Sequence, residues 1–224
     1  MKTQCSFGHA AFWIAAPFCL CAAAATFDDV QFWTGTGAQR AALVLDWNDG
    51  KAPESLVWGF RWDGPATGLD LLHAIVAADS RLFSHASEPG PFGVSVYGIG
   101  YDANGDGWFG VSPSVEFDAG GSSVGGPDDL RVPIDAADHW AEGWNLGFWG
   151  YNLKSSAADP WTSAMTGPSG RALSDGAWDG YSFAPSFNFT DPSEPFPAPV
   201  PEPVVAALLA IGCLALVWAR PTRR

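Results

Sequence analysis

Between residues 26 and 187, apolar residues mostly alternate with polar ones or form short continuous runs, and this pattern predicts β-strands. Three such runs come first: VQFWTG (30–35), RAALVLDW (40–47) and SLVWGFRW (55–62). The second and third are joined through Asn48-Asp49-Gly50, which is a turn signal. Strand-like runs return at 92–102 and 107–117, and Trp-rich runs follow at 144–151 and 177–183.

One segment, TGLDLLHAIVAADSRLF at 67–83, has the helical period instead. Thr67 and Asp70 have the spacing of a capping box, and apolar residues recur at helical intervals after them. The order strand, strand, helix, strand predicts an α+β domain over 26–187, with a mainly antiparallel β-sheet and one main helix over 67–83.

Cysteine and charge limit the class of protein. Cys5, Cys19, Cys21 and Cys213 lie near the chain ends, so core packing rather than disulfides must hold the domain together. All 24 carboxylates lie between Asp28 and Glu202, whereas four of the 11 basic side chains lie outside, which leaves that stretch a formal charge of −17. Because such a surface repels phosphate backbones, nucleic acid is not expected as a partner.

The first 25 residues have the pattern of a secretory signal peptide. They begin with the basic Lys2, continue with an Ala-rich apolar run expected to form the signal helix, and end with small residues at Ala23 and Ala25. The sequence therefore predicts an exported protein.

The chain ends in four features of distinct composition. They are a Pro-rich linker (188–200), the tripeptide Pro201-Glu202-Pro203, an apolar run (204–218) and the basic cluster Arg220, Arg223 and Arg224. The apolar run has 15 residues, whereas a transmembrane helix needs about 20. Positive charge directly after it places that end in the cytoplasm. In this order, the features at 201–224 resemble the PEP-CTERM sorting signal.

That resemblance implies a Gram-negative bacterium and an exosortase, a membrane-embedded enzyme that cuts near the Pro-Glu-Pro tripeptide. The short transmembrane helix at 204–218 then inserts only transiently in the inner membrane, before the protein reaches the cell surface or the extracellular space. The family is associated with exopolysaccharide and biofilm. The alternative is that 204–218 is a permanent anchor.

A second resemblance concerns the domain itself. The order strand, strand, helix, followed later by GWNLGFWGYNL (143–153) and LSDGAWDGYSF (173–183), resembles the β-grasp-type domain at the C-terminus of transcobalamin-like proteins. It covers about residues 38–183. It implies a β-grasp-like fold and a ligand-binding or adhesive role, and it transfers no ligand-contacting residue.

Asp102, Asn104 and Asp106, followed by Gly107, match the first half of a calcium-binding loop. Oxygen ligands alternate along such a loop, and the glycine permits its sharp turn. The twelfth position, which takes a bidentate Glu in a complete EF-hand, is Pro113 here. A metal-free hairpin turn is the alternative to a calcium cofactor.

Four tryptophans, Trp140, Trp144, Trp149 and Trp178, lie in a region rich in carboxylates and amides. Sugar rings stack on indoles while such polar groups bind the hydroxyls, so these residues are candidate polysaccharide ligands. The alternative is that they fill the core.

His139 and Glu142 lie three positions apart, and with His73 and His85 they are candidate ligands of a metal site. The spacing matches no recognised metal motif, and ordinary core or surface histidines are the alternative.

Together, these features predict an exported, exosortase-processed protein of the cell surface or extracellular matrix. A non-enzymatic binding or structural role with polysaccharide as partner is the first interpretation. A secreted polysaccharide hydrolase and a small-ligand, cobalamin-like binding module are the alternatives. The sequence contains no His-Glu-x-x-His motif.

Overall fold

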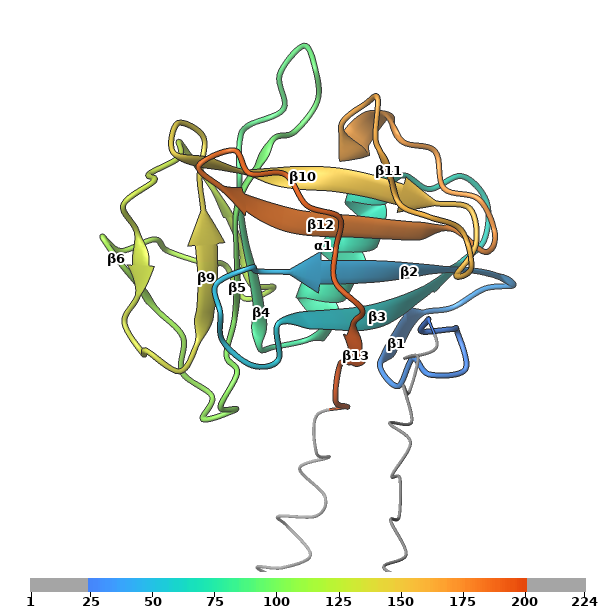
Figure 1. Ribbon diagram of the computed structural model, residues 1–224, viewed down its shortest axis with the longest axis horizontal. Helices are drawn as coiled ribbons and strands as arrows, with labels where there is room; N and C mark the ends of the chain where they lie inside the picture. The colour runs from blue at the N-terminus through green and yellow to red at the C-terminus, as the bar shows by residue number, and fades with distance from the viewer. Residues whose placement is uncertain (1–23, 201–224) are drawn as a thin grey trace, which may run out of the picture.

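The structure is a computed structural model that describes residues 24–200, and its regular structure is mostly β-sheet (Figure 1). The larger sheet has the strand order β1-β3-β2-β12-β10-β11, and β13 also pairs with β3. Its strands are β1 (Trp33–Gly35), β2 (Gln39–Asp46), β3 (Ser55–Trp62), β10 (Gly147–Lys154), β11 (Thr162–Ser163), β12 (Trp178–Pro185) and β13 (Phe196–Pro197). The described residues form one α-helix, α1 (Gly68–Ala78), and a short 3-10 helix, η1 (Pro168–Gly170).

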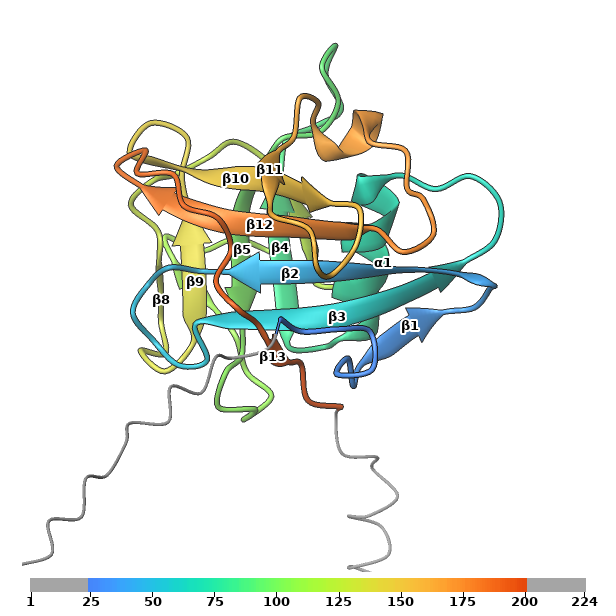
Figure 2. The ribbon, with the colours of Figure 1, turned by 45° about the vertical axis from the view of Figure 1, so that its right-hand side comes forward.

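A smaller sheet of order β7-β4-β5-β9 lies beside the larger one, and its strands cross the direction of the larger sheet in both views (Figures 1 and 2). It consists of β4 (Leu82–Ala86), β5 (Val96–Tyr101), β7 (Ser122–Val124) and β9 (His139–Glu142). β6 (Val111–Ser112) and β8 (Val132–Pro133) form a separate two-stranded ladder. Antiparallel pairings outnumber parallel ones, although β12 pairs parallel to β2 in the middle of the larger sheet. The predicted class, mainly β with one helix, is confirmed at this level.

The predicted strands at 40–47 and 55–62 correspond to β2 and β3, which form an antiparallel hairpin. β2 is buried on both faces, because Leu43 and Leu45 belong to one hydrophobic cluster and Ala42 and Val44 to another. This explains its continuous apolar run, which a strand exposed on one face would not need. The run at 30–35 forms only the short β1.

The predicted helix begins as expected and ends early. Thr67 is its N-cap, and Thr67 and Asp70 make the reciprocal hydrogen bonds of a capping box. The predicted end at residue 83 is wrong, because α1 ends at Ala78. The buried Asp79 carboxylate accepts the Arg81 backbone N–H at 3.2 Å and the Trp58 indole N–H at 2.9 Å, which turns the chain into β4.

The strand predicted at 107–117 is also wrong, since only Val111–Ser112 pairs there. Its apolar residues instead pack as an aromatic cluster. The ring of Phe109 stacks on Phe83 of β4 with centroids 4.2 Å apart, and Phe117 meets Phe83 edge-on at 5.1 Å. The alternation of apolar and polar residues at 107–117 therefore reflects packing of an irregular segment against the smaller sheet.

Both faces of the larger sheet are covered. One face packs against α1 and the smaller sheet, and the other carries Trp178 with Phe27 and Trp161. The Pro-rich segment at 188–200, predicted as a linker, runs back across the second face to β13 (Figure 2). The Ala198 N–H donates to the Val57 carbonyl at 3.0 Å, and Ala198 is fully buried. The segment is thus packed on the domain at Pro192 and Ala198, which are buried.

The described chain begins and ends at the same side of the domain (Figures 1 and 2), and the Ala25 N–H donates to the Glu194 carboxylate there. None of the helices between residues 24 and 200 has the length and apolar character of a membrane span. Most of the signal peptide predicted at 1–25, together with the transmembrane helix predicted at 204–218, lies outside the described residues. The predicted sorting residues also lie outside them: Pro201, Glu202, Pro203, Arg220, Arg223 and Arg224.

Candidate functional site

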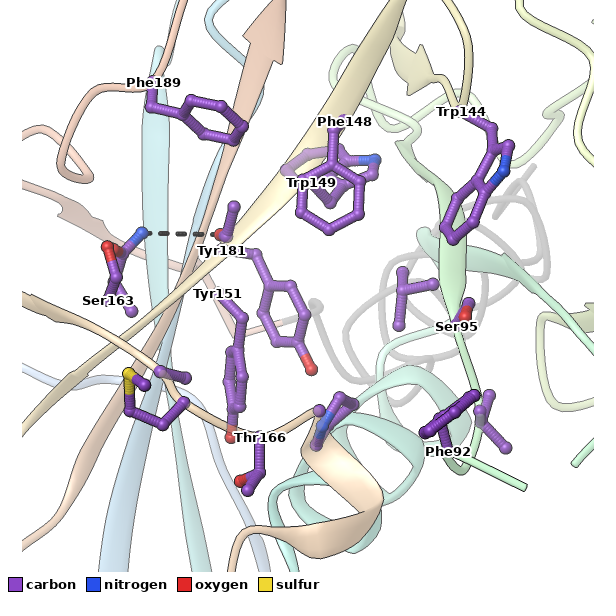
Figure 3. A pocket seen from close by; sticks show the side chains of 18 of the residues that line it. Phe92, Ser95, Trp144, Phe148, Trp149, Tyr151, Ser163, Thr166, Tyr181 and Phe189 are labelled. Carbon is purple, nitrogen blue, oxygen red and sulfur yellow. Dashed lines mark hydrogen bonds between the residues drawn. The ribbon is translucent and has the colours of Figure 1, made fainter. Parts of the chain in front are cut away.

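A pocket of about 590 Å³ opens beside the larger sheet, on the side of the domain away from the two described chain ends. β10 and β12 supply one wall, and the segments 92–96 and 163–168 supply the others. Its aromatic lining residues are Phe92, Trp144, Phe148, Trp149, Tyr151, Tyr181 and Phe189. In Figure 3, Tyr151 and Tyr181 lie between the group of Trp144, Phe148 and Phe189 and the opposing residues Thr166 and Phe92.

The mouth of the pocket exposes large apolar side chains. Phe92 is 97% exposed, Met165 96%, Phe189 64% and Trp144 44%. Such side chains gathered at one concavity are typical of a binding site, since a soluble domain otherwise covers them. Ser95, Asn152, Ser163, Thr166 and Thr190 add polar groups to the lining.

Asp129 positions Trp144 at this mouth. Its Oδ1 accepts the backbone N–H groups of Trp144 (2.6 Å), Asn145 (2.8 Å) and Leu146 (2.9 Å), and its Oδ2 accepts the Asn145 amide. Desolvation alone raises the pKa of Asp129, but these hydrogen bonds outweigh it and hold the pKa well below its usual range. The ionised carboxylate therefore fixes the turn that carries Trp144.

The wall formed by β10 and β12 contains a tyrosine pair. Tyr151 and Tyr181 are opposite each other in the ladder, with ring centroids 4.8 Å apart. The Tyr151 hydroxyl donates to Asp179, which is fully buried and whose Oδ1 lies 3.5 Å from Arg171 Nη2. A Cβ at Gly68, the first residue of α1, would lie 2.1 Å from the Tyr151 hydroxyl. The helix start must therefore be glycine for this network to form.

The Tyr181 hydroxyl is buried and has no hydrogen-bond partner among residues 24–200. Burial, with a smaller contribution from Asp179, raises the pKa of Tyr181 well above its ordinary value, so the phenol stays protonated. An unpaired buried hydroxyl destabilises a fold, which makes this group a candidate for ligand binding.

The structure separates the four predicted ligand tryptophans. Trp144 and Trp149 line the pocket, although Trp149 is only 2% exposed and its indole donates to the Ala141 carbonyl at 3.0 Å. Trp140 is buried against Phe109, and Trp178 is buried on the opposite face of the larger sheet. The last two fill cores, so the four do not form one exposed row.

The predicted calcium residues form a closed turn. Asp102 is buried and its two oxygens accept the N–H groups of Gly105 (2.7 Å) and Gly107 (2.9 Å). Asn104 and Asp106 each accept the N–H two residues further on. Among residues 24–200, no three His, Cys, Asp or Glu side chains form a group that could hold a metal ion. The three side chains thus make the hydrogen bonds of a closed turn.

The histidines do not gather at one site either. His139 lies 3.0 Å from Asp49, whereas Glu142 lies 2.6 Å from Arg131 and 4.0 Å from His85. Residues three apart in a strand point to opposite faces, and β9 is a strand. His73 is exposed on α1. The predicted pairing of His139 with Glu142 fails for this reason.

Comparisons with family models, with curated proteins and with solved structures return no match for this chain. The site is therefore interpreted from its own geometry. Sequence reasoning missed Tyr151 and Tyr181, although each follows a glycine in an aromatic strand-like run and the two runs pair. Phe92 and residues 164–167 carried no signal of a binding site, because they lie outside the helices and strands.

Proposed function

We propose that this chain is an exported, exosortase-processed bacterial protein whose domain is a non-enzymatic binding module for polysaccharide at the cell surface or in the extracellular matrix. The signal peptide and the sorting signal read from the sequence support the route. The aromatic pocket supports the binding role. β10, β11 and η1, which contribute to the pocket, lie at the side of the domain opposite the two described chain ends (Figures 1 and 2), so both a tethered and a released form leave the pocket open.

The observation that carries the binding role is the composition of the lining. Apolar ring faces suit the C–H faces of sugars, and serine, threonine and asparagine side chains suit their hydroxyls. Hydrolysis of a glycoside uses two carboxylates on either side of the scissile bond. Among the described residues that line the pocket, Asp191 is the single carboxylate. This lining supports binding over the alternative of a polysaccharide hydrolase.

The topology supports a β-grasp-like core. The strands that carry that resemblance pair in the order β3-β2-β12-β10, and α1 lies on one face of this sheet (Figure 1). The smaller sheet comes from residues 82–142, between the helix and β10, and so has the place of an insertion. A volume of about 590 Å³ also suits a compact small ligand, which keeps the small-ligand module as a second candidate.

Tryptophan fluorescence of the protein purified from its native host tests the proposal, with the host's own exopolysaccharide as the probe. We expect saturable quenching, and Trp144→Ala should weaken the affinity about tenfold, because one stacking surface is lost. Trp108→Ala is the matched control, since Trp108 is 50% exposed and does not line the pocket. An unchanged wild-type spectrum, or equal affinity losses in the two variants, contradicts the proposal.

A further inference from the structure

The charge of the pocket lining and of the surrounding chain bears on which class of saccharide the pocket binds. Asp191, which is exposed, is the single charged residue among the described residues of the lining, and the stretch 28–202 has a formal charge of −17. We propose that the pocket takes a short neutral saccharide segment rather than one bearing uronate or sulfate groups, with the Tyr181 hydroxyl as its buried hydrogen-bonding group. This inference rests on the proposed function and specifies its ligand class.

Two cations belong to the segments that form the pocket, and both have other partners. Arg171 follows η1, where Nη2 faces Asp179 and Nη1 donates to the Ala172 carbonyl at 2.9 Å. Lys154, at the end of β10, lies over the Trp161 ring at 4.3 Å, on the opposite face of the sheet. An anionic sugar entering the pocket therefore meets Asp191 and aromatic rings without a compensating cation, which is costly.

Tyr181 gives the pocket a fixed polar group. Its neighbour Tyr151 donates its hydroxyl to Asp179, whereas the Tyr181 hydroxyl is unpaired within residues 24–200. A neutral phenol both donates to a sugar ring oxygen and accepts from a sugar hydroxyl. Buried polar groups that lack a hydrogen bond destabilise a fold and are typical of functional positions. A bound ligand that supplies the missing hydrogen bond would therefore explain the unpaired Tyr181 hydroxyl.

The shape of the site limits the length of the bound segment. A volume of about 590 Å³ falls in the range of pockets that enclose a compact ligand. Aromatic side chains stand on more than one side of the pocket: in Figure 3, Trp144 and Phe148 lie on one side, Phe92 lies opposite them, and the tyrosine pair lies beside them. This concave arrangement suits a chain end or a short oligosaccharide better than the flat surface of a packed polysaccharide.

Isothermal titration of the host-purified protein with length-matched glycans tests the charge selection. The probes are neutral gluco-, galacto- and manno-hexasaccharides, compared with hexagalacturonate and a sulfated heparin hexasaccharide. We expect binding of at least one neutral probe, with an affinity that does not change with ionic strength, and at least tenfold weaker binding of both anionic probes. Asp191→Asn should reduce the difference in affinity between the neutral and the anionic probes, because it removes the single charge among the described residues of the lining.

Paired hydroxyl deletions test the role of Tyr181. Tyr181→Phe keeps the ring, and we expect about tenfold weaker binding of the neutral probe with an equal or higher melting temperature, because an unpaired buried hydroxyl is removed. Tyr151→Phe should lower the melting temperature, since Asp179 loses a hydrogen bond. Wild-type affinity in Tyr181→Phe overturns the assignment of that hydroxyl, because a purely structural group leaves affinity unchanged.

The possible results distinguish failure of the neutral-ligand inference from failure of the proposed polysaccharide-binding function. Anionic probes that bind as tightly as neutral ones, or more tightly, overturn the neutral-ligand inference and leave the polysaccharide-binding function standing. Absence of binding to every hexasaccharide together with saturable binding of the host exopolysaccharide overturns the short-segment inference alone. Absence of binding to the hexasaccharides and to the exopolysaccharide overturns the proposed function and this inference with it.

Discussion

Asp138→Asn is expected to stabilise the protein at neutral pH. The Asp138 side chain is fully buried, its Oδ1 accepts the Ala103 N–H at 3.2 Å, and its Oδ2 has no hydrogen-bond partner within residues 24–200. Burial raises the pKa of Asp138 to about 6, and the nearby Asp102, Asp135 and Asp106 act in the same direction, although the bond from Ala103 opposes it. At neutral pH the folded protein therefore holds an unfavourable buried charge.

The magnitude follows from the two pKa values. The ordinary pKa of the group is 3.8, so folding raises it by roughly 2 pH units, which costs about 3 kcal/mol once the group is ionised in both states. Because the folded state binds this proton more tightly, the cost is fully present above pH 6 and shrinks as the pH falls toward 4. The substitution should therefore raise the free energy of unfolding by about 3 kcal/mol at pH 7.5 and by about 1 kcal/mol at pH 4.5.

Urea denaturation followed by tryptophan fluorescence at the two pH values measures this difference. Asp159→Asn is the matched control, because Asp159 is an exposed carboxylate on a loop, and its substitution should change stability little at either pH. A gain for Asp138→Asn that is equal at both pH values, or a loss at pH 7.5, refutes the reasoning that burial and neighbouring carboxylates raise this pKa.

Three further predictions concern the mouth of the pocket, the acidic turn and the tail. Asp129→Asn should lower the free energy of unfolding by about 1–2 kcal/mol and weaken saccharide binding, because the turn carrying Trp144 loses its charged acceptor. Denaturation measures the stability and titration measures the affinity. An unchanged affinity contradicts the role of Asp129 in positioning Trp144. Millimolar calcium should leave the melting temperature unchanged, because Asp102 already accepts two backbone N–H groups; a rise that Asp106→Ala abolishes would establish a calcium site instead. Protein released by the native host should have an intact mass ending near the 201–203 tripeptide, and a mass that includes Arg224 contradicts exosortase processing.

The sequence predicted those helices and strands in which the local pattern of apolar residues matches their burial in the structure. β2 and β3 have continuous apolar runs, and consecutive residues of both strands are buried. The capping box at Thr67 and Asp70, which starts α1, is purely local. The end of α1 was missed because a distant contact decides it. The buried Asp79 binds the indole of Trp58 and the side chain of Arg81, and no local pattern reports that arrangement.

The site was predictable only in part, because composition does not report exposure. The Trp-rich acidic composition pointed to the region of Trp144 and Trp149, and both line the pocket. It did not separate them from Trp140 and Trp178, whose burial depends on which face of a strand meets which sheet. The unpaired hydroxyl of Tyr181 is visible only once its neighbours in space are known.

The central claim is that saccharide enters the aromatic pocket, and the tryptophan indole N–H signals of the isotope-labelled protein report on it directly. Titration with the neutral hexasaccharide that binds tightest should shift the signals of Trp144 and Trp149, which line the pocket, and leave those of Trp108 and Trp178 in place. Assignment by single Trp→Phe variants identifies each signal. Shifts confined to Trp108, or saturable binding that moves neither pocket signal, would place the ligand elsewhere and contradict the account.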